Sequence, residues 1–429
     1  MSSVTTMSEV KGRGTYMNIS RDRLSVIGKL IGIYREERRN NTQNGFTLKK
    51  FCEGICSINT LKRIEAGGLS RSEDVYIELL GKLDLKFGEF PVIDEALKKL
   101  YVDLYNAIEF YDRAGIDKII SKSLRLLENA DKYIYYSEIK LLLISVREYY
   151  ANDKNLNISE VKHLMEILPI IDVDLKDFIR ILIFSKLRTN CVSDIETYRK
   201  YIKALELGQA LHKCVKFAII HNFLIMKKYH SMNKILNELE SYYIESHNSI
   251  RLIDVYNYKL ILYSYTDIEY MDTLIDKIEN LIDKEYIPDI KISEIYSNIA
   301  SSYHNRELYV EALRYYKKTL EYHEGDLLRQ SILIADCQNH LNYKRQIPIV
   351  SGKDYENYPI DLKLMYKYFT LSDDTPVFVK QNYIMKKILP YLEDDTCIKI
   401  FKYELNKLLE ESNNYKLLYD FNKTLEQSK

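Results

Sequence analysis

Four residues near the start of a short helical segment have side chains that proteins use to read DNA bases: Ile58, Asn59, Lys62 and Arg63. An Asn amide can bind adenine through two hydrogen bonds, Lys and Arg can bind guanine, and Ile can contact the methyl group of thymine. Upstream, Arg38 and Arg39 could contact phosphates. The alternative is a solvated Lys–Arg pair on an ordinary helical surface, and spacing alone does not decide between the two.

Three asparagines recur at intervals of 35 and 41 residues, close to the length of a helical repeat: Asn222, Asn257 and Asn298. An amide side chain both donates and accepts hydrogen bonds, so a row of amides can hold a peptide backbone without reading its sequence. Side-chain pockets for such a peptide are expected from Tyr256, Tyr296 and Lys259. The alternative is that these asparagines are ordinary surface residues of an Asn-rich chain.

No residue pattern in the chain predicts catalysis. A Gly-rich phosphate loop, an HExxH zinc motif and a nucleophile elbow are all missing from the sequence. The six cysteines are scattered, which does not indicate a disulfide framework, and Cys52 and Cys56 have no second pair at zinc-ligand spacing. We therefore expect no enzyme, no cofactor and no bound metal.

The candidate DNA-reading residues lie in a stretch that predicts two short helices with a tight break between them. Thr47 is a suitable N-cap for the first helix, Gly54 interrupts the chain, and Ser57 is a suitable cap for the second. Leu61 and Ile64 would then face inward, because they lie three residues apart on a helix. This arrangement leaves the candidate residues on the outer side of the second helix.

Further helices are expected on either side of this pair. Apolar residues at three- and four-residue spacing predict a helix over 24–39, and another is expected over 74–83. Together these elements define a head over 21–85, followed by a Gly- and Pro-containing linker over 86–94. Residues 1–20 are rich in Ser, Thr and Gly and have no periodicity, so we expect a disordered tail.

The net charge of zero hides an uneven distribution of charge along the chain. Residues 21–71 contain eleven Lys and Arg against five Asp and Glu, a balance of +6, and residues 1–20 add +1. The remaining 358 positions therefore carry −7. A basic head on a mildly acidic body fits a head that contacts nucleic-acid phosphates.

From residue 95 onward the sequence predicts helices almost throughout. The clearest unit is 292–322, where seven residues match the spacing of a tetratricopeptide repeat: Tyr296, Ile299, Ala300, Tyr303, Ala312, Tyr316 and Thr319. Weaker helix pairs are expected at intervals of roughly 35 to 40 residues: 95–129, 132–167, 174–207, 211–245, 251–284, 326–350, 359–392 and 395–427. Such pairs stack into a right-handed superhelix with a concave wall, so the expected fold class is all-α.

The segment EGICSINTLKRIEAG resembles the helix-turn-helix of the Xre/Cro-like group. It is most similar to the form found in peptide-responsive regulators of Gram-positive bacteria, the RRNPP relatives Rgg, Rap, NprR, PlcR and PrgX. The likeness covers about twenty residues closely and the first eighty loosely. One departure is that Ile55–Cys56 replaces the usual Gly-Val before the Ser. Composition and domain order look most like the clostridial members that link sporulation, toxin and motility genes.

The resemblance implies roles for further residues of the head. It implies that the segment from Ser57 to Arg63, which includes Thr60, faces the DNA groove, and that Glu65 supports the fold. With Thr47, these residues complete the set of candidate DNA contacts. In the same family, concave asparagines of the repeats hold a short secreted peptide that has re-entered the cell. The expected architecture is an N-terminal Xre/Cro-like helix-turn-helix domain followed by a right-handed tetratricopeptide-repeat superhelix over 95–429.

These observations together predict a transcriptional regulator that binds double-stranded DNA as a homodimer and responds to a short signalling peptide. The repeats would sense the peptide and dimerise. The sequence shows no secretory signal and no apolar run of membrane-spanning length, so we expect a cytoplasmic protein without membrane contact. The alternative is a Rap-like regulator whose repeats grip a response regulator or phosphatase target without needing DNA.

Overall fold

A computed structural model describes residues 19–41, 45–152, 154–190, 195–322, 327–350, 353–372, 374–392, 394–412 and 415–428. Over these residues every regular element is a helix, and the one pairing of extended backbone is an isolated bridge between Lys86 and Tyr133. The predicted all-α class is therefore confirmed. In the same part of the chain no helix has the length and apolar character needed to cross a membrane. Residues 1–18 of the predicted tail lie outside the described residues.

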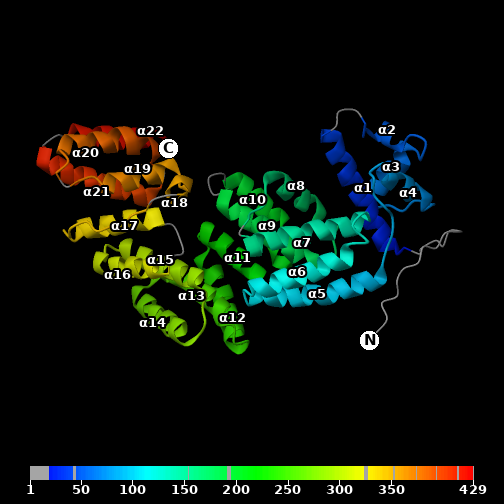
Figure 1. The fold of residues 1–429 in the computed structure, drawn as a ribbon, viewed down its shortest axis with the longest axis horizontal. Coiled ribbons are helices and arrows are strands. Elements are labelled where there is room, and N and C mark those ends of the chain that lie inside the picture. The colour runs from blue at the N-terminus through cyan, green and yellow to red at the C-terminus, as the bar shows by residue number, and fades with distance from the viewer. Residues whose placement is uncertain are drawn as a thin grey trace. The chain divides into compact units, whose positions relative to one another are not determined.

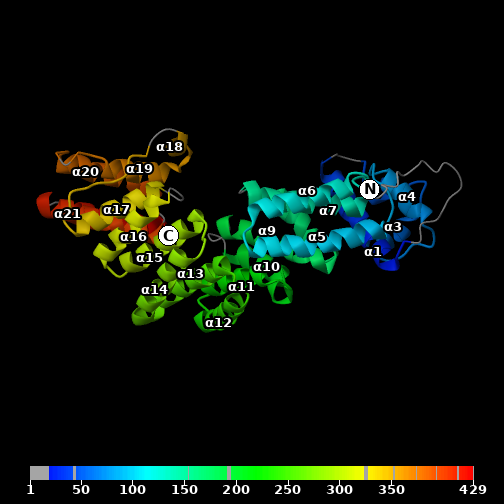
Figure 2. The same cartoon turned by 60° about the horizontal axis from the view of Figure 1, so that its bottom comes forward.

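The chain divides into two compact units, Met1–Ile235 and Leu236–Lys429, and the division falls inside α12 (Tyr229–Glu245). Figures 1 and 2 show the helices in two views. The first unit contains α1 (Arg21–Asn41), α2 (Leu48–Cys52), α3 (Ile58–Glu65), α4 (Asp74–Gly81), α5 (Pro91–Glu109), α6 (Arg113–Leu127), α7 (Ile134–Asn152), α8 (Ile158–Ile167), α9 (Val173–Asn190), α10 (Ile195–Ala204), the short 3₁₀ helix η1 (Leu207–Gln209) and α11 (Lys213–Ile225).

Two short capped helices, α2 and α3, form where the sequence predicts them. The Thr47 hydroxyl accepts a hydrogen bond from the backbone N–H of Lys50, and the Ser57 hydroxyl accepts one from Thr60. Between the helices Gly54 has φ of +80°, a left-handed conformation that favours glycine. Both predicted N-caps and the predicted break are confirmed.

The end of α3 is set by a glycine turn. The backbone N–H groups of Gly67 and Gly68 donate to the carbonyls of Ile64 and Arg63, and Gly67 has φ of +86°. These bonds satisfy carbonyls that the last helical turn leaves open. Leu61 and Ile64 are fully buried, as the spacing predicts.

The helices of the head share their core with the helices that follow. One cluster of buried side chains runs from α1 through α11. The predicted linker over 86–94 is fixed to α7, because the backbone of Lys86 pairs beside Tyr133 and the Phe90 N–H donates to the Tyr136 hydroxyl at 2.6 Å. The α1–α4 region is therefore packed against the helices that follow it.

The second unit contains α13 (Ser249–Thr266), α14 (Ile268–Lys284), α15 (Asp289–His304), α16 (Tyr309–Glu321), α17 (Leu327–His340), α18 (Lys353–Asn357), α19 (Ile360–Phe369), α20 (Val377–Tyr383), the π turn η2 (Ile384–Ile388), the 3₁₀ turn η3 (Leu389–Tyr391), α21 (Asp395–Ser412) and α22 (Lys416–Ser428). The helices α15 and α16 pack together as a pair. All seven residues that predicted this pair are buried, from Tyr296 to Thr319.

Most helix pairs predicted from the sequence are present, but the pair predicted over 326–350 is wrong. Only α17 forms there. After α17 the backbone enters the left-handed region at Asn342, with φ of +53°, and the amide of Gln338 then binds both the N–H and the carbonyl of Gln346. This side-chain clamp holds the following residues in a non-helical path along α17.

Tyrosines supply much of the buried volume in both units. The chain has 38 tyrosines and no tryptophan. The largest fully buried side chains include Tyr76, Tyr135, Tyr136, Tyr198, Tyr243, Tyr315, Tyr316 and Tyr368. A buried phenol fills space between helices and still has a hydroxyl that must find a partner. Tyr368, for example, donates to Glu404 at 2.9 Å.

Candidate nucleic-acid and peptide sites

The outer face of α3 carries the four predicted base-reading residues, all of them exposed: Ile58, Asn59, Lys62 and Arg63. Residues four apart on a helix lie on the same side, so these four form one face opposite the buried Leu61 and Ile64. The hydroxyls of Ser57 and Thr60 lie 3.0 Å apart at the first turn. The face thus offers an amide, two cations and an apolar group to solvent.

Two glycines on α1 allow α3 to approach it closely. A Cβ atom on Gly28 would lie 2.4 Å from the backbone oxygen of Ile64, and one on Gly32 would lie 3.1 Å from the Cβ of Glu65. The glycines are four residues apart and so lie on the same side of α1. The seat of α3 on α1 therefore depends on the absence of side chains at these two positions.

A buried ion pair ties the end of α3 to α1. Arg35, only 3% exposed, binds both carboxylate oxygens of Glu65, at 2.5 Å from Nε and 2.9 Å from Nη2. The same guanidinium donates to the carbonyl of Phe46 at 3.2 Å. Such a fork-shaped pair fixes geometry as well as charge. Glu65 thus lies in a fold-supporting position, in keeping with the role that the family resemblance implies.

Arg38 and Arg39, the predicted phosphate contacts, are engaged with groups of the protein itself. Arg38 donates to the carbonyl of Leu83 at 2.6 Å and pairs with Asp84 at 3.3 Å. Arg39 pairs with Glu36 at 3.2 Å, one helical turn away. Arg39 is exposed and Arg38 is half-exposed at the end of α1, so the contacts to Asp84 and Glu36 lie at the surface.

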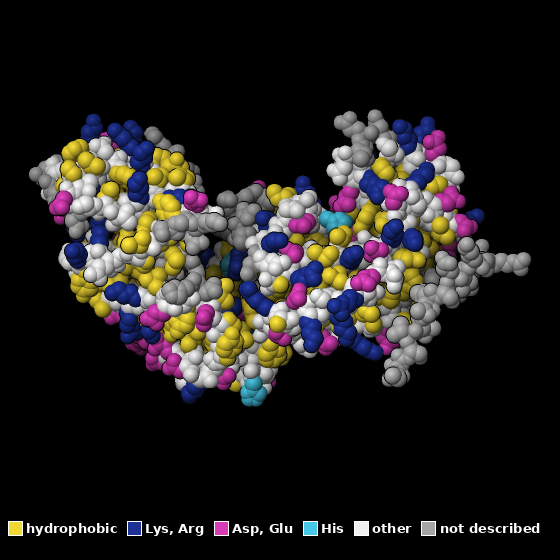
Figure 3. Space-filling view, in the orientation of Figure 1, with side chains coloured by type: hydrophobic (Ala, Val, Ile, Leu, Met, Phe, Trp, Pro, Cys, Tyr) yellow, Lys and Arg dark blue, Asp and Glu magenta, His cyan; other side chains and the backbone are white. Residues whose placement is uncertain are grey.

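The surface charge of the head is smaller than its composition indicates. Arg35 and Arg23 are buried in ion pairs, so neither cation reaches the surface. Figure 3 shows Lys and Arg side chains intermixed with Asp and Glu on the face of this region that it presents. Lys49 and Lys50 on α2 are exposed and were not among the predicted contacts. Two adjacent lysines in a short helix are the sequence signal that could have identified them as candidate contacts.

His163, which no sequence pattern indicated, links α1 to α7 and α8. The ring of His163 on α8 lies 2.6 Å from Glu37 of α1 and 2.8 Å from Glu138 of α7. Burial disfavours its charge, but the hydrogen bonds that the protonated ring donates to Glu138 and Glu37 outweigh this and raise the pKa of His163 to about 10. The three residues lie far apart in the chain, so no local pattern predicts the link.

In the second unit, two of the candidate peptide-binding asparagines contact each other. The Asn298 amide donates to the Asn257 oxygen at 2.8 Å, and the Asn257 amide donates to Glu294 at 3.3 Å. One turn further along the helices, Lys291 pairs with Asp254 at 2.5 Å. A polar row therefore runs between α13 and α15, and it includes two of the three candidate asparagines, Asn257 and Asn298.

Lys259 lies outside this polar row. It is 2% exposed, and its ammonium group donates to Asn237 at 2.7 Å and pairs with Glu240, both on α12. The side chain therefore points away from α15, whereas Asn257 on the same helix points toward it. A buried ammonium with two protein partners is not available to a peptide.

The remaining candidates are also largely enclosed. Tyr256 and Tyr296 are buried, and the Tyr296 ring packs 5.9 Å from that of Tyr315 with the Lys318 ammonium 5.0 Å above it. Asn222 lies in the first unit, and its side-chain oxygen is buried without a hydrogen-bond partner. The two tyrosines thus serve as packing groups between helices.

The described residues contain no group of three or more His, Cys, Asp or Glu side chains that could hold a metal ion. The cysteines in the same part of the chain are free thiols: Cys52, Cys56, Cys214, Cys337 and Cys397. Comparison of the chain with models of known families, with curated proteins and with solved structures finds no match in any of the three. The candidate sites therefore rest on the geometry of this chain and on the likeness of one short segment.

Proposed function

We propose that this protein is a DNA-binding transcriptional regulator whose activity is set by a short peptide held in its helical repeats. In this proposal α1–α4 form an Xre/Cro-like helix-turn-helix domain, and the helices from α5 onward form a tetratricopeptide-repeat superhelix. The observation that carries the proposal is the outer face of α3, where Asn59, Lys62 and Arg63 are exposed beside a buried inner face.

The α2–α3 arrangement supports the DNA-binding part of this proposal. In a helix-turn-helix the second helix presents its first turns to base edges in the major groove. Here α3 has a capped first turn, base-reading side chains on its outer face and a rigid seat on α1 through Arg35–Glu65. A pseudo-palindromic operator needs two such heads, so the active form is a homodimer.

The DNA-binding proposal is tested by removing the outer face of α3. The triple variant Asn59→Ala, Lys62→Ala, Arg63→Ala should weaken binding to the DNA upstream of the protein's own gene at least about a hundredfold, because each lost base contact costs about 1–3 kcal/mol. The dependence of affinity on salt should also become shallower, since two cations are gone. Fluorescence anisotropy with labelled DNA at several salt concentrations measures both effects.

A control triple removes the same residue types from exposed positions on α5 and α6: Asn106→Ala, Lys122→Ala and Arg125→Ala. This variant should bind DNA as the unmodified protein does. If the two triples lose affinity equally, the binding is a non-specific charge effect. If the α3 triple binds normally, the head does not read DNA, and the alternative of a protein-gripping regulator takes its place.

The polar row between α13 and α15 supports the peptide-binding part of the proposal. Asn257 has both amide functions engaged, by Asn298 and Glu294, whereas Asn298 donates to Asn257 and keeps its oxygen as an acceptor for a peptide N–H. Glu294 is exposed beside them and adds a negative charge. The row therefore suits an extended peptide backbone accompanied by a basic side chain or amino terminus.

Calorimetry of the full chain against short peptides encoded in the same genome tests this part. We expect saturable heat from one peptide, and Asn298→Ala should weaken it about tenfold through one lost hydrogen bond. Asn280→Ala on α14 is the matched control, because Asn280 is exposed and outside the row. Equal effects of the two variants, or no heat from any peptide, would contradict the peptide site.

A further inference from the structure

A cavity lies in the first unit where the start of α1 meets α5 and α9. It has a volume of about 350 Å³ and is lined by Ser20, Asp22, Arg23, Val26, Glu89, Lys98, Asp172, Val173 and Asp174. Four separate stretches of chain contribute to it: the start of α1, the segment before α5, α5 itself and the junction of α8 with α9. This volume falls at the lower end of the range for small-molecule sites.

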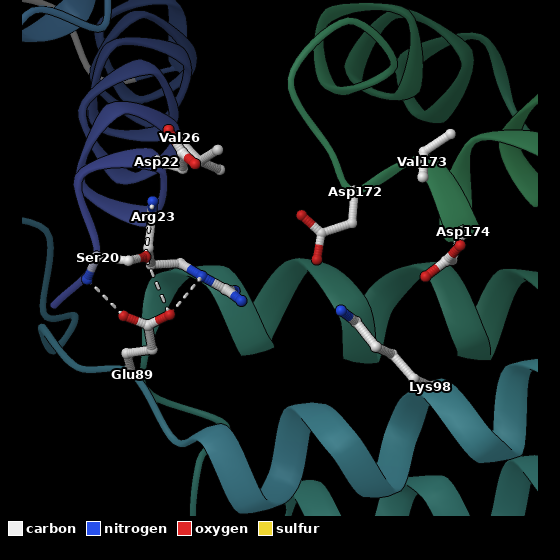
Figure 4. A pocket seen from close by; sticks show the side chains of 9 residues that line it. All are labelled: Ser20, Asp22, Arg23, Val26, Glu89, Lys98, Asp172, Val173 and Asp174. Atoms are coloured by element: carbon white, nitrogen blue, oxygen red, sulfur yellow. Dashed lines mark hydrogen bonds and ion pairs between the residues drawn. The ribbon is translucent and has the colours of Figure 1, made fainter.

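Charged groups of both signs converge on the cavity. Figure 4 shows the Arg23 guanidinium reaching into it from α1, while the Lys98 ammonium and the Asp172 carboxylate point toward one another across it. Arg23 and Lys98 supply the positive charge. The negative charge comes from Asp22, Glu89, Asp172 and Asp174.

Some of these groups have partners and others do not. Arg23 is 9% exposed, donates to Asp94 at 3.0 Å and lies 3.4 Å from the centre of the Tyr135 ring, yet its Nη1 has no hydrogen-bond partner. Asp172 accepts a hydrogen bond from the Tyr135 hydroxyl at 2.5 Å. Among the described residues, Asp22, Lys98 and Asp174 form no ion pair at all.

Two cations lining one cavity favour a bound anionic group, since isolated like charges are costly in a partly buried site. Water or an anionic group could satisfy Arg23 and Lys98, but a simple anion would also face the carboxylates of Asp22 and Asp174. A simple cation would face Arg23 and Lys98. A molecule with both charges a few ångströms apart avoids both penalties.

We propose that this cavity binds a small zwitterion, a free α-amino acid or a close analogue. Its carboxylate would lie against Arg23 and Lys98, and its ammonium group against Asp172 and the unpaired Asp174. The cavity is too small for a peptide of several residues, so this site is distinct from the polar row between α13 and α15. Because its walls come from α1 and from α5 and α9, the ligand joins the head to the first repeats.

Titration calorimetry of the full chain tests the proposal with the free amino acids one at a time as probes. We expect saturable heat from at least one of them. The N-acetyl derivative and the methyl ester of that amino acid should each bind at least about tenfold more weakly, because each loses one charged contact. Acetate and methylamine, which carry one charge each, serve as single-sign probes and should give no saturable heat.

Two variants at the rim of the cavity locate the binding without disturbing buried Arg23. Lys98→Ala and Asp174→Asn should each weaken the amino acid about tenfold. Lys99→Ala is the matched control, because Lys99 is the neighbouring exposed lysine of α5 and pairs with Glu95 outside the cavity. The proposal is overturned if no amino acid binds at millimolar concentration, if the blocked forms or acetate bind as well, or if the rim variants bind like Lys99→Ala.

Discussion

Glu65 fixes the end of α3 to α1 through its ion pair with Arg35. Replacing it with Ala leaves buried Arg35 with only the more exposed Glu36 and the Phe46 carbonyl as partners, and a poorly compensated buried charge is costly. We therefore expect Glu65→Ala to lower the free energy of unfolding by about 3 kcal/mol. Chemical denaturation followed by circular dichroism measures this loss.

Glu36 provides the control for the Glu65 prediction, because it contacts the same guanidinium at 2.8 Å from an exposed position. Glu36→Ala should change the free energy of unfolding by less than about 1 kcal/mol, as exposed pairs do. Replacing both buried partners, with Arg35→Met and Glu65→Leu, should restore most of the lost stability. A double variant as unstable as Glu65→Ala alone would show that the ion pair is not the cause.

His163 should make the stability of the first unit depend on pH. Its pKa in the folded protein is about 10, above the ordinary value of 6.5, so its contribution is full below pH 6.5 and is lost as pH rises toward 10. We expect His163→Gln to cost about 3 kcal/mol near pH 6 and clearly less near pH 9, since two charged hydrogen bonds are removed. Denaturation of both proteins at the two pH values measures the difference.

The exposed histidine His230 provides the control for the pH prediction. His230→Gln should leave the free energy of unfolding unchanged at both pH values. If His163→Gln costs the same at both, the link through Glu37 and Glu138 acts by packing alone and the charge of the imidazole is unimportant.

At the residue scale, the sequence predicted which residues lie on the exposed face of α3. It did not predict which basic residues of the head are buried. Asn59, Lys62 and Arg63 are exposed, in line with the helical spacing. By contrast, Arg23 and Arg35 were counted in the predicted basic surface, but both are buried against partners that lie 71 and 30 residues away in the chain. A count of charges cannot separate these cases, because burial is decided by residues distant in the sequence.

At the element scale, the contact of α3 with α1 should be sensitive to one methyl group. Gly28→Ala places a Cβ against the backbone oxygen of Ile64, which cannot move without shifting α3. We expect a loss of about 2 kcal/mol in the free energy of unfolding, although Ala favours a helix over Gly by about 1 kcal/mol. Thermal or urea denaturation measures the change.

Gly81 in α4 is the matched glycine for that test, because a Cβ there would meet nothing within 4 Å. Gly81→Ala should stabilise the protein by about 0.5–1 kcal/mol through helix propensity alone. If Gly28→Ala behaved in the same way, α3 would not be seated on α1 as closely as the structure has it.

The sequence predicted helices correctly where the N-caps and the apolar spacing involve residues close together in the chain. Thr47, Ser57 and Gly54 defined α2 and α3, and the repeat spacing defined α15 and α16. The helix pair predicted over 326–350 is wrong because the Gln338 amide binds the backbone of Gln346. The residues after α17 therefore follow a non-helical path and form no second helix. A side-chain clamp of this kind leaves no periodic signal in the sequence.

For the whole molecule, the shared core predicts that the head is not an independent folding unit. Its buried side chains belong to a cluster that continues through α11. A fragment of residues 1–90 should therefore unfold without a sharp transition, because its apolar surface has lost its partners. A fragment of residues 1–247, which keeps α1 through α12, should unfold cooperatively. Circular dichroism during heating compares the two, and a sharp transition of the short fragment would contradict the prediction.

The order of the helices along the chain was predictable, but the way they pack was not. Helices follow one another in the order that the apolar spacing predicts, from α1–α4 to the later pairs. The link of His163 with Glu37 and Glu138 and the cavity at Arg23 both arise where distant segments meet. Such junctions depend on the packed fold and leave no mark within any one segment.

The many buried tyrosines also give the protein an intrinsic spectroscopic probe. With no tryptophan in the chain, the near-ultraviolet signal comes mainly from phenol rings. Burial raises the pKa of Tyr256, Tyr198 and Tyr315 to about 12, so these phenols ionise only in strong alkali while the fold persists. An alkaline spectrophotometric titration therefore distinguishes solvent-facing rings from those enclosed between helices, without any attached label.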